Sequence, residues 1–149
     1  MGAATDYGQI IKILVNDEDL KTLMDIPVNE KTNYGLLTQK YFLQTFVSDE
    51  FTGDGVCRLL VRAGMSIDTN NEYVKRQGLI IEVYVPKSKD LMSGFETRTN
   101  KISDQLVKTL NRIYVNDNKL IYQDSYETMS GSNNYKRQYV KFEYKKVIH

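Results

Sequence analysis

The chain has 149 residues, which suits one hydrophobic core and is small for two, so one α+β domain over residues 1–149 is predicted. Hydrophobic residues make up 41% and charged residues 26%, which excludes wholesale disorder, and the net charge of +1 disfavours bulk binding to nucleic acid. The single cysteine, Cys57, excludes an intramolecular disulfide and a thiolate metal cluster. No apolar run is long enough to cross a bilayer, so no membrane partner is expected.

Two short helices are predicted at the N-terminus. Within residues 7–15 the apolar side chains recur at helical spacing. Asn16 is predicted to cap a second helix, which opens with an acidic first turn over 17–19, runs through 20–24 and must end before Pro27.

The following region is less regular. Turn-forming residues interrupt 27–40, the aromatic segment 41–47 fits either a strand or a helix end, and 48–55 has loop composition.

Two strands form the centre of the predicted fold. Residues 56–64 alternate between a core face and a second face, and residues 77–86 are rich in β-branched side chains and close on a proline. In the latter, Leu79 to Val85 presents an apolar face, expected to meet helices, and a mixed face with Glu82 and Tyr84 that is expected to be half-covered. The polar stretch 66–76 between the strands is interpreted as a long connecting loop.

The C-terminal half predicts a helix and a hairpin. A second long loop over 87–98 leads to Thr97 or Thr99 as the cap of an amphipathic helix over about 99–114. Residues 119–129 and 135–144 then flank a turn and form a long hairpin. The predicted fold class is therefore α+β: a mostly antiparallel sheet of four to five strands, packed on one face by this helix and the N-terminal helices.

Catalytic chemistry is poorly represented in the sequence. The one histidine, His149, is terminal, and the glycines form no phosphate-binding fingerprint, so no cofactor and no metal are expected. Glu143-Tyr144-Lys145 has the E-x-K spacing of some metal-dependent nucleases, with Asp124 upstream. The favoured interpretation is the alternating charge of a half-exposed strand.

The same hairpin interleaves tyrosines with basic residues. Tyr135, Arg137 and Tyr139 belong to a pattern that suits single-stranded nucleic acid, by stacking and charge, and equally suits a protein interface. The near-neutral chain favours the protein interface.

The order of elements resembles the tail-terminator (tail-completion) and neck proteins of tailed bacteriophages. The similarity covers most of residues 10–148 and is best in Gly78-Leu79-Ile80-Ile81-Glu82-Val83-Tyr84-Val85, followed by Thr97-Arg98-Thr99-Asn100-Lys101-Ile102-Ser103-Asp104-Gln105-Leu106-Val107. Residues 27–51 have no clear counterpart and are interpreted as an insertion or an extra strand. No catalytic signature defines this family, so no catalytic residue is carried over.

The resemblance implies a structural virion protein, assembled in the host cytoplasm. Such a protein forms a homo-oligomeric ring, expected to be hexameric, that caps the tail tube and joins it to the head connector, with DNA able to pass through. Its partners would be its own copies, the tail-tube protein and the connector or neck protein; a head-completion adaptor is the alternative. The predicted interface residues are Ile67, Asp68, Asn70, Glu72, Lys75, Lys87, Lys89, Tyr135, Arg137 and Tyr139.

Overall fold

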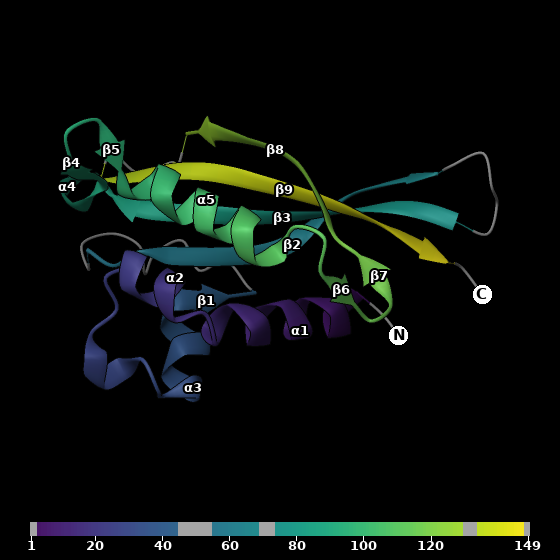
Figure 1. The fold of residues 1–149 in the computed structure, drawn as a ribbon, viewed down its shortest axis with the longest axis horizontal. Helices are drawn as coiled ribbons and strands as arrows, with labels where there is room; N and C mark the ends of the chain where they lie inside the picture. Colours follow the sequence, from purple (N-terminus) through teal and green to yellow (C-terminus); the bar gives the residue numbers. More distant parts are fainter. Residues whose placement is uncertain (1–2, 45–54, 69–73, 130–133, 148–149) are drawn as a thin grey trace.

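A five-stranded sheet with helices on one face forms the body of the protein (Figure 1). The computed structural model describes residues 3–44, 55–68, 74–129 and 134–147. The strand order is β1-β2-β3-β9-β8, and every pairing is antiparallel except the parallel one between β1 and β2. The predicted α+β fold class is confirmed.

The central strand is β3 (Val74–Pro86), as predicted. Leu79, Ile81, Val83 and Val85 are fully buried in the main core, which the helices complete. The strand ends at Pro86, whose ring nitrogen has no hydrogen to donate to a continuing ladder.

Three helices cover one face of the sheet: α1 (Ala3–Val15), α2 (Glu18–Leu23) and α5 (Arg98–Leu110). The apolar stripe of α5 is fully buried at Ile102, Leu106 and Leu110. Thr97 caps α5 by accepting a hydrogen bond from the Asn100 amide, which confirms the first of the two predicted caps.

The predicted cap of α2 was one residue too early. Asp17, not Asn16, caps the helix by accepting from the Leu20 amide. The Asn16 side chain instead donates to the Lys12 carbonyl at the end of α1. The Asp17 carboxylate also accepts from Thr109 (2.5 Å) and Gln105 (3.1 Å), so one side chain starts α2 and ties it to α5.

The irregular region contains both helical turns and an extra strand. It forms the 3₁₀ turn η1 (Val28–Glu30), the helical turn α3 (Tyr34–Leu36), the π-helical turn η2 (Leu37–Tyr41) and the edge strand β1 (Phe42–Leu43). The segment 41–47 thus combines a helix end with a strand in the part that the structure describes. The loop predicted over 48–55 lies outside the described residues except for Gly55.

Helix α5 is shorter than its apolar pattern predicts. It ends at Leu110 because Asn111 is extended and Arg112 has a positive φ of 70°. Tyr114 falls in a small hairpin of β6 (Tyr114–Val115) and β7 (Asn118–Lys119). Asn116 and Asp117 form its turn, with φ of 49° and 67°. Such angles suit Asn and Asp at hairpin turns.

Both predicted connecting loops contain regular structure, and those predictions are corrected. Strand β2 (Arg58–Asp68) continues past residue 66, and β3 begins at Val74. Residues 87–98 form a helical turn α4 (Lys87–Asp90) and a small hairpin of β4 (Leu91–Ser93) and β5 (Glu96–Thr97), and α5 starts at Arg98. Backbone pairing does not require apolar side chains, so polarity alone wrongly predicted loops.

The C-terminal hairpin is confirmed as β8 (Ile121–Thr128) and β9 (Tyr135–Val147). Strand β9 pairs with β3 over its full length, while β8 forms the outer edge of the sheet.

Cys57 provides a direct test of burial. Its side chain is 1% exposed, and burial raises the pKa of the thiol to about 11. We expect the native protein to resist alkylation by iodoacetamide at pH 8 and to react on denaturation, because only the thiolate is nucleophilic. Mass spectrometry of protein treated with and without urea measures this; rapid native labelling would contradict the buried placement.

Candidate protein interface

In the part of the chain that the structure describes, no helix packs on the second face of the sheet, which we call the open face. It carries alternate residues of neighbouring strands, placed together by their pairing: Arg62 on β2, Glu82 and Tyr84 on β3, Arg137, Tyr139 and Lys141 on β9, and Tyr126 on β8. The alternation along each strand thus brings these side chains together as one cluster across neighbouring strands.

 

The centre of the open face is a buried carboxylate, Glu82, whose side chain is only 6% exposed. It accepts hydrogen bonds from Arg62 Nε at 2.5 Å, from Tyr84 Oη at 2.8 Å and from Arg137 Nη1 at 3.4 Å. Burial, together with Glu82, raises the pKa of Tyr84 to about 12, so this hydroxyl stays neutral and donates. A charge that is buried is tolerated when it is paired in this way.

Aromatic rings extend this network over the outer strands. The Tyr139 ring lies 5.2 Å from the Arg62 guanidinium and 5.0 Å from that of Arg137. Tyr126 contacts Tyr139 edge to face at 5.6 Å between ring centroids and receives Lys141 Nζ at 5.1 Å. These cation–π contacts hold the side chains in defined positions, which favours recognition by reducing the entropy lost on binding.

The structure divides the basic and aromatic residues of the hairpin between two faces. Arg137, Tyr139 and Lys141 lie on the open face, whereas Tyr144 is buried on the helix side and donates to Asp6 at 3.0 Å. Tyr135, predicted as an interface residue, is only 3% exposed and packs with Leu60 and Tyr84. Its side chain therefore belongs to a small second core rather than to a docking surface.

The nuclease-like residues do not form a shared site. Glu143 accepts two hydrogen bonds from Arg76, at 2.6 and 2.9 Å, and Asp124 pairs in register with Lys141. Within the described ranges, no three His, Cys, Asp or Glu side chains lie close enough to hold a metal ion. The alternating charge predicted for this strand accounts for Glu143 and Lys141.

One group of predicted interface residues lies at an arm that projects past the helices (Figure 1). The arm consists of residues 66–68 of β2, 74–77 of β3 and 144–147 of β9. Ile67 and Asp68 pair with Arg76 and Lys75 there, and Lys75 is exposed. Asn70 and Glu72 lie outside the described residues.

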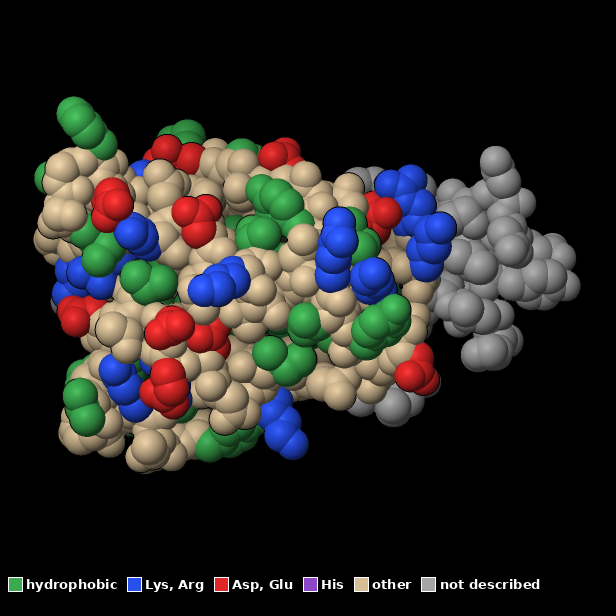
Figure 2. All heavy atoms as spheres, viewed as in Figure 1, with side chains coloured by type: hydrophobic (Ala, Val, Ile, Leu, Met, Phe, Trp, Pro, Cys, Tyr) green, Lys and Arg blue, Asp and Glu red, His purple; other side chains and the backbone are tan. Residues whose placement is uncertain are grey.

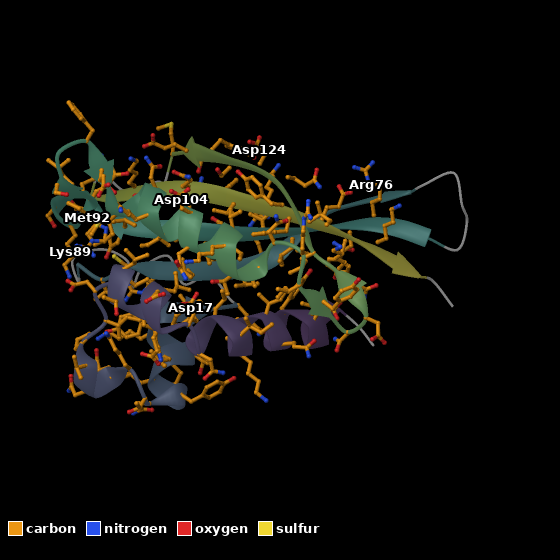
Figure 3. All side chains as sticks on the ribbon, in the orientation of Figure 1. Asp17, Arg76, Lys89, Met92, Asp104 and Asp124 are labelled. Carbon is orange, nitrogen blue, oxygen red and sulfur yellow. The ribbon has the colours of Figure 1, made fainter. Side chains whose placement is uncertain are left out.

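The other group lies at the opposite end of the molecule. Lys87 and Lys89 belong to α4, at the far end of β3 from the arm, and Figure 3 shows Lys89 and Met92 at one end and Arg76 toward the other. The 13 residues of β3 separate the two groups by roughly 40 Å. The structure therefore produces two distant surfaces instead of one combined site.

The α4 end is held by a polar network around Asp90. Its carboxylate accepts from the Thr99 amide (3.0 Å) and hydroxyl (2.5 Å) and pairs with Lys136 (3.2 Å). Lys89 is paired with Asp25 at 3.3 Å. Partial burial acts to raise the pKa of Asp90, but the bonds from Thr99 and Lys136 outweigh it and hold the pKa below its ordinary value.

Replacing Asp90 by asparagine tests this network. We expect the free energy of unfolding at pH 7 to fall by about 1–3 kcal/mol, because Thr99 and Lys136 lose a charged acceptor. Because the pKa of Asp90 is lower in the folded state, its carboxylate stabilises the fold fully above the unfolded-state pKa of about 4. This stabilisation is lost as the pH falls through the folded-state pKa, so the difference in stability between wild type and variant should shrink in acid. Urea unfolding at pH 7 and pH 3.5 measures this, and a difference independent of pH would contradict it.

The sequence interpretation missed three exposed apolar side chains beside α4, namely Leu91, Met92 and Phe95. The sequence did contain a sign of them, because large apolar residues in a polar segment, without helical or strand spacing, belong to no face that would be buried. It also missed Arg62 as a partner of Glu82, which only strand pairing reveals.

A protein-family model named YomW matches residues 9–145. The chain belongs to the YomW family. Its fold is similar to that of a chain in the virion of a native gene transfer agent particle, with a TM-score of 0.59 and 10% sequence identity, covering 96% of this chain and 95% of that one. No curated protein matches the sequence. Among the described residues of this YomW family member, no helix is long and apolar enough to cross a membrane.

Proposed function

We propose that this protein is a structural component of a phage-like particle, in which it forms the ring that terminates the tail tube and joins it to the head connector. The observation that carries the proposal is the fold shared along almost the whole length of both chains with a component of a gene transfer agent virion. A similarity that covers 96% of this chain and 95% of that one indicates that the two chains share one architecture over their length.

The position of the two predicted docking surfaces supports a joining role. The arm at one end and α4 at the other are separated by the length of β3, and a protein that connects two different partners needs two separate surfaces. In this proposal one end contacts the tail-tube protein and the other the connector or neck protein, and copies of the chain contact each other around the ring.

The experiment is to locate the protein in assembled particles by immunogold labelling of a tagged chain. We expect gold at the junction of tail and head in particles that carry the tag and none on untagged particles. Label at the head vertex in tailless heads would instead support a head-completion adaptor. Label along the tail or at its distal end, or no label on particles, would contradict both positions.

A second candidate, a module that binds single-stranded nucleic acid, is favoured by the Tyr126, Tyr139 and Lys141 cluster on the open face. It predicts binding of oligonucleotides that weakens with salt and on replacing Arg137 or Tyr139. The pairing of Arg137 and Arg62 with Glu82 reduces the positive charge that this face offers to phosphate. The ring is therefore the function we favour.

A further inference from the structure

The small hairpin of β4 and β5 exposes three large apolar side chains, which we call the tip. Phe95 is fully exposed at 103%, Leu91 is 70% exposed and Met92 is 40% exposed. Figure 2 shows a hydrophobic side chain projecting beyond the body at this end of the molecule. Exposed apolar residues grouped in this way commonly mark an interaction site.

The tip is mounted on a rigid base. Arg98 donates to the Lys89 carbonyl at 2.9 Å and to the Leu23 carbonyl at 2.7 Å, which connects the start of α5 to α4 and α2. Asp90 fixes the same segment to Thr99 and Lys136. The apolar side chains are thus presented on a fixed support, and little conformational freedom is lost when they bind.

The chain also carries a pocket of about 450 Å³ on another part of its surface, between α1, α3 and β1. Its apolar lining includes Ile11, Tyr34, Phe42 and Leu43, with Gln39 and Gln44 adding polar groups. In Figure 1 α1, α3 and β1 lie in the lower part of the molecule, whereas β4 and β5 lie at its upper left, so a chain does not fill the pocket with its own tip.

Gly8 supplies a second observation at this pocket. It lies in the interior of α1 and lines the pocket, and a Cβ placed on it would meet no atom within 4 Å. A glycine inside a helix costs roughly 0.5–1 kcal/mol relative to alanine, and nothing in the packing of the described residues requires it here. Its use is explained if another molecule approaches the helix closely at this point.

We propose that the tip of one copy docks into this pocket of a second copy. The tip and the pocket are different surfaces of one chain, so the contact is heterologous and repeats from copy to copy, as a closed ring requires. The formal net charge of +1 opposes self-association only weakly. This contact specifies how neighbouring subunits of the proposed ring would meet. It rests on the proposed function for the expectation that the repeated contacts close into a ring.

The test is the mass of the purified full-length chain, measured by sedimentation and native mass spectrometry up to millimolar concentration. We expect wild type to assemble, and Phe95→Ser to weaken assembly by roughly 30-fold or more because it removes an aromatic anchor. Gly8→Leu should block the pocket without lowering the melting temperature, because leucine favours helix. Val28→Ser, which removes an 81% exposed apolar side chain from η1, is the matched control and should assemble like wild type.

A mixture of the two blocked variants gives the sharpest result. Phe95→Ser keeps an intact pocket and Gly8→Leu keeps an intact tip, so together they should form a dimer with one copy of each and nothing larger. A wild type that stays monomeric, variants that assemble like wild type, or a mixture that forms no dimer would each overturn the proposal. Loss of particle incorporation by Phe95→Ser with unchanged self-assembly would assign the tip to a different protein instead. Immunogold position is measured independently, so failure of this contact is distinguishable from failure of the proposed particle role.

Discussion

Replacing Glu82 by alanine is expected to lower the free energy of unfolding by about 3 kcal/mol, toward the lower end of the range for removing one partner of a buried ion pair. The carboxylate accepts from Arg62, Arg137 and Tyr84, and its loss leaves these donors without their shared acceptor. We expect the loss of stability to lie near the lower end of this range because the Arg62 side chain is 37% exposed and can be hydrated. Urea denaturation at pH 7 measures the change.

Glu143→Ala is the matched control for Glu82→Ala, because Glu143 is also paired with an arginine on the sheet. Its side chain is 20% exposed and that of its partner Arg76 is 42% exposed, so water can replace much of the interaction. We expect a clearly smaller loss of stability than for Glu82→Ala. Equal losses would mean that burial does not distinguish the two carboxylates, and would contradict the central role assigned to Glu82.

Replacing Leu110 by alanine is expected to cost about 2–5 kcal/mol, the range for truncating a fully buried leucine. Leu110 is the last residue of α5, is 0% exposed and belongs to the main core. Thermal or urea unfolding followed by circular dichroism measures the loss.

The control for Leu110 is Tyr114→Ala, four residues further along the same apolar pattern. Helical spacing predicts that both residues face the sheet, but the structure ends the helix at Leu110 and leaves Tyr114 66% exposed in β6. We expect Tyr114→Ala to change stability by no more than about 0.5 kcal/mol. A large loss would show that α5 continues through Tyr114 in solution.

The open face explains how a sheet that helices cover on one face keeps a charged residue in its central strand. Glu82 alternates with Ile81 and Val83, which point into the helix-covered core, so its side chain must lie on the opposite face. There the two neighbouring strands supply Arg62 and Arg137 to neutralise it. The face thus combines paired charges with rings in edge-to-face contact.

Much of the fold could be predicted because it depends on local patterns. Alternation identified β3 and the C-terminal hairpin, and the three- and four-residue spacing identified α5, since these periods follow from the geometry of each element. The ends were less predictable. The stop of α5 depends on the backbone at Arg112, and the extension of β2 to Asp68 depends on its partner strand.

The sequence by itself determined the α+β class, the central strand with its two unlike faces, and a helix cap at Thr97 or Thr99, because each is set by residues close together in the chain. Only the tertiary structure decided which side chains meet: Glu82 with Arg62 and Arg137, Asp90 with Thr99 and Lys136, and the arm and α4 at opposite ends of β3. Those contacts depend on strand order and register, which arise from packing between segments far apart in the sequence.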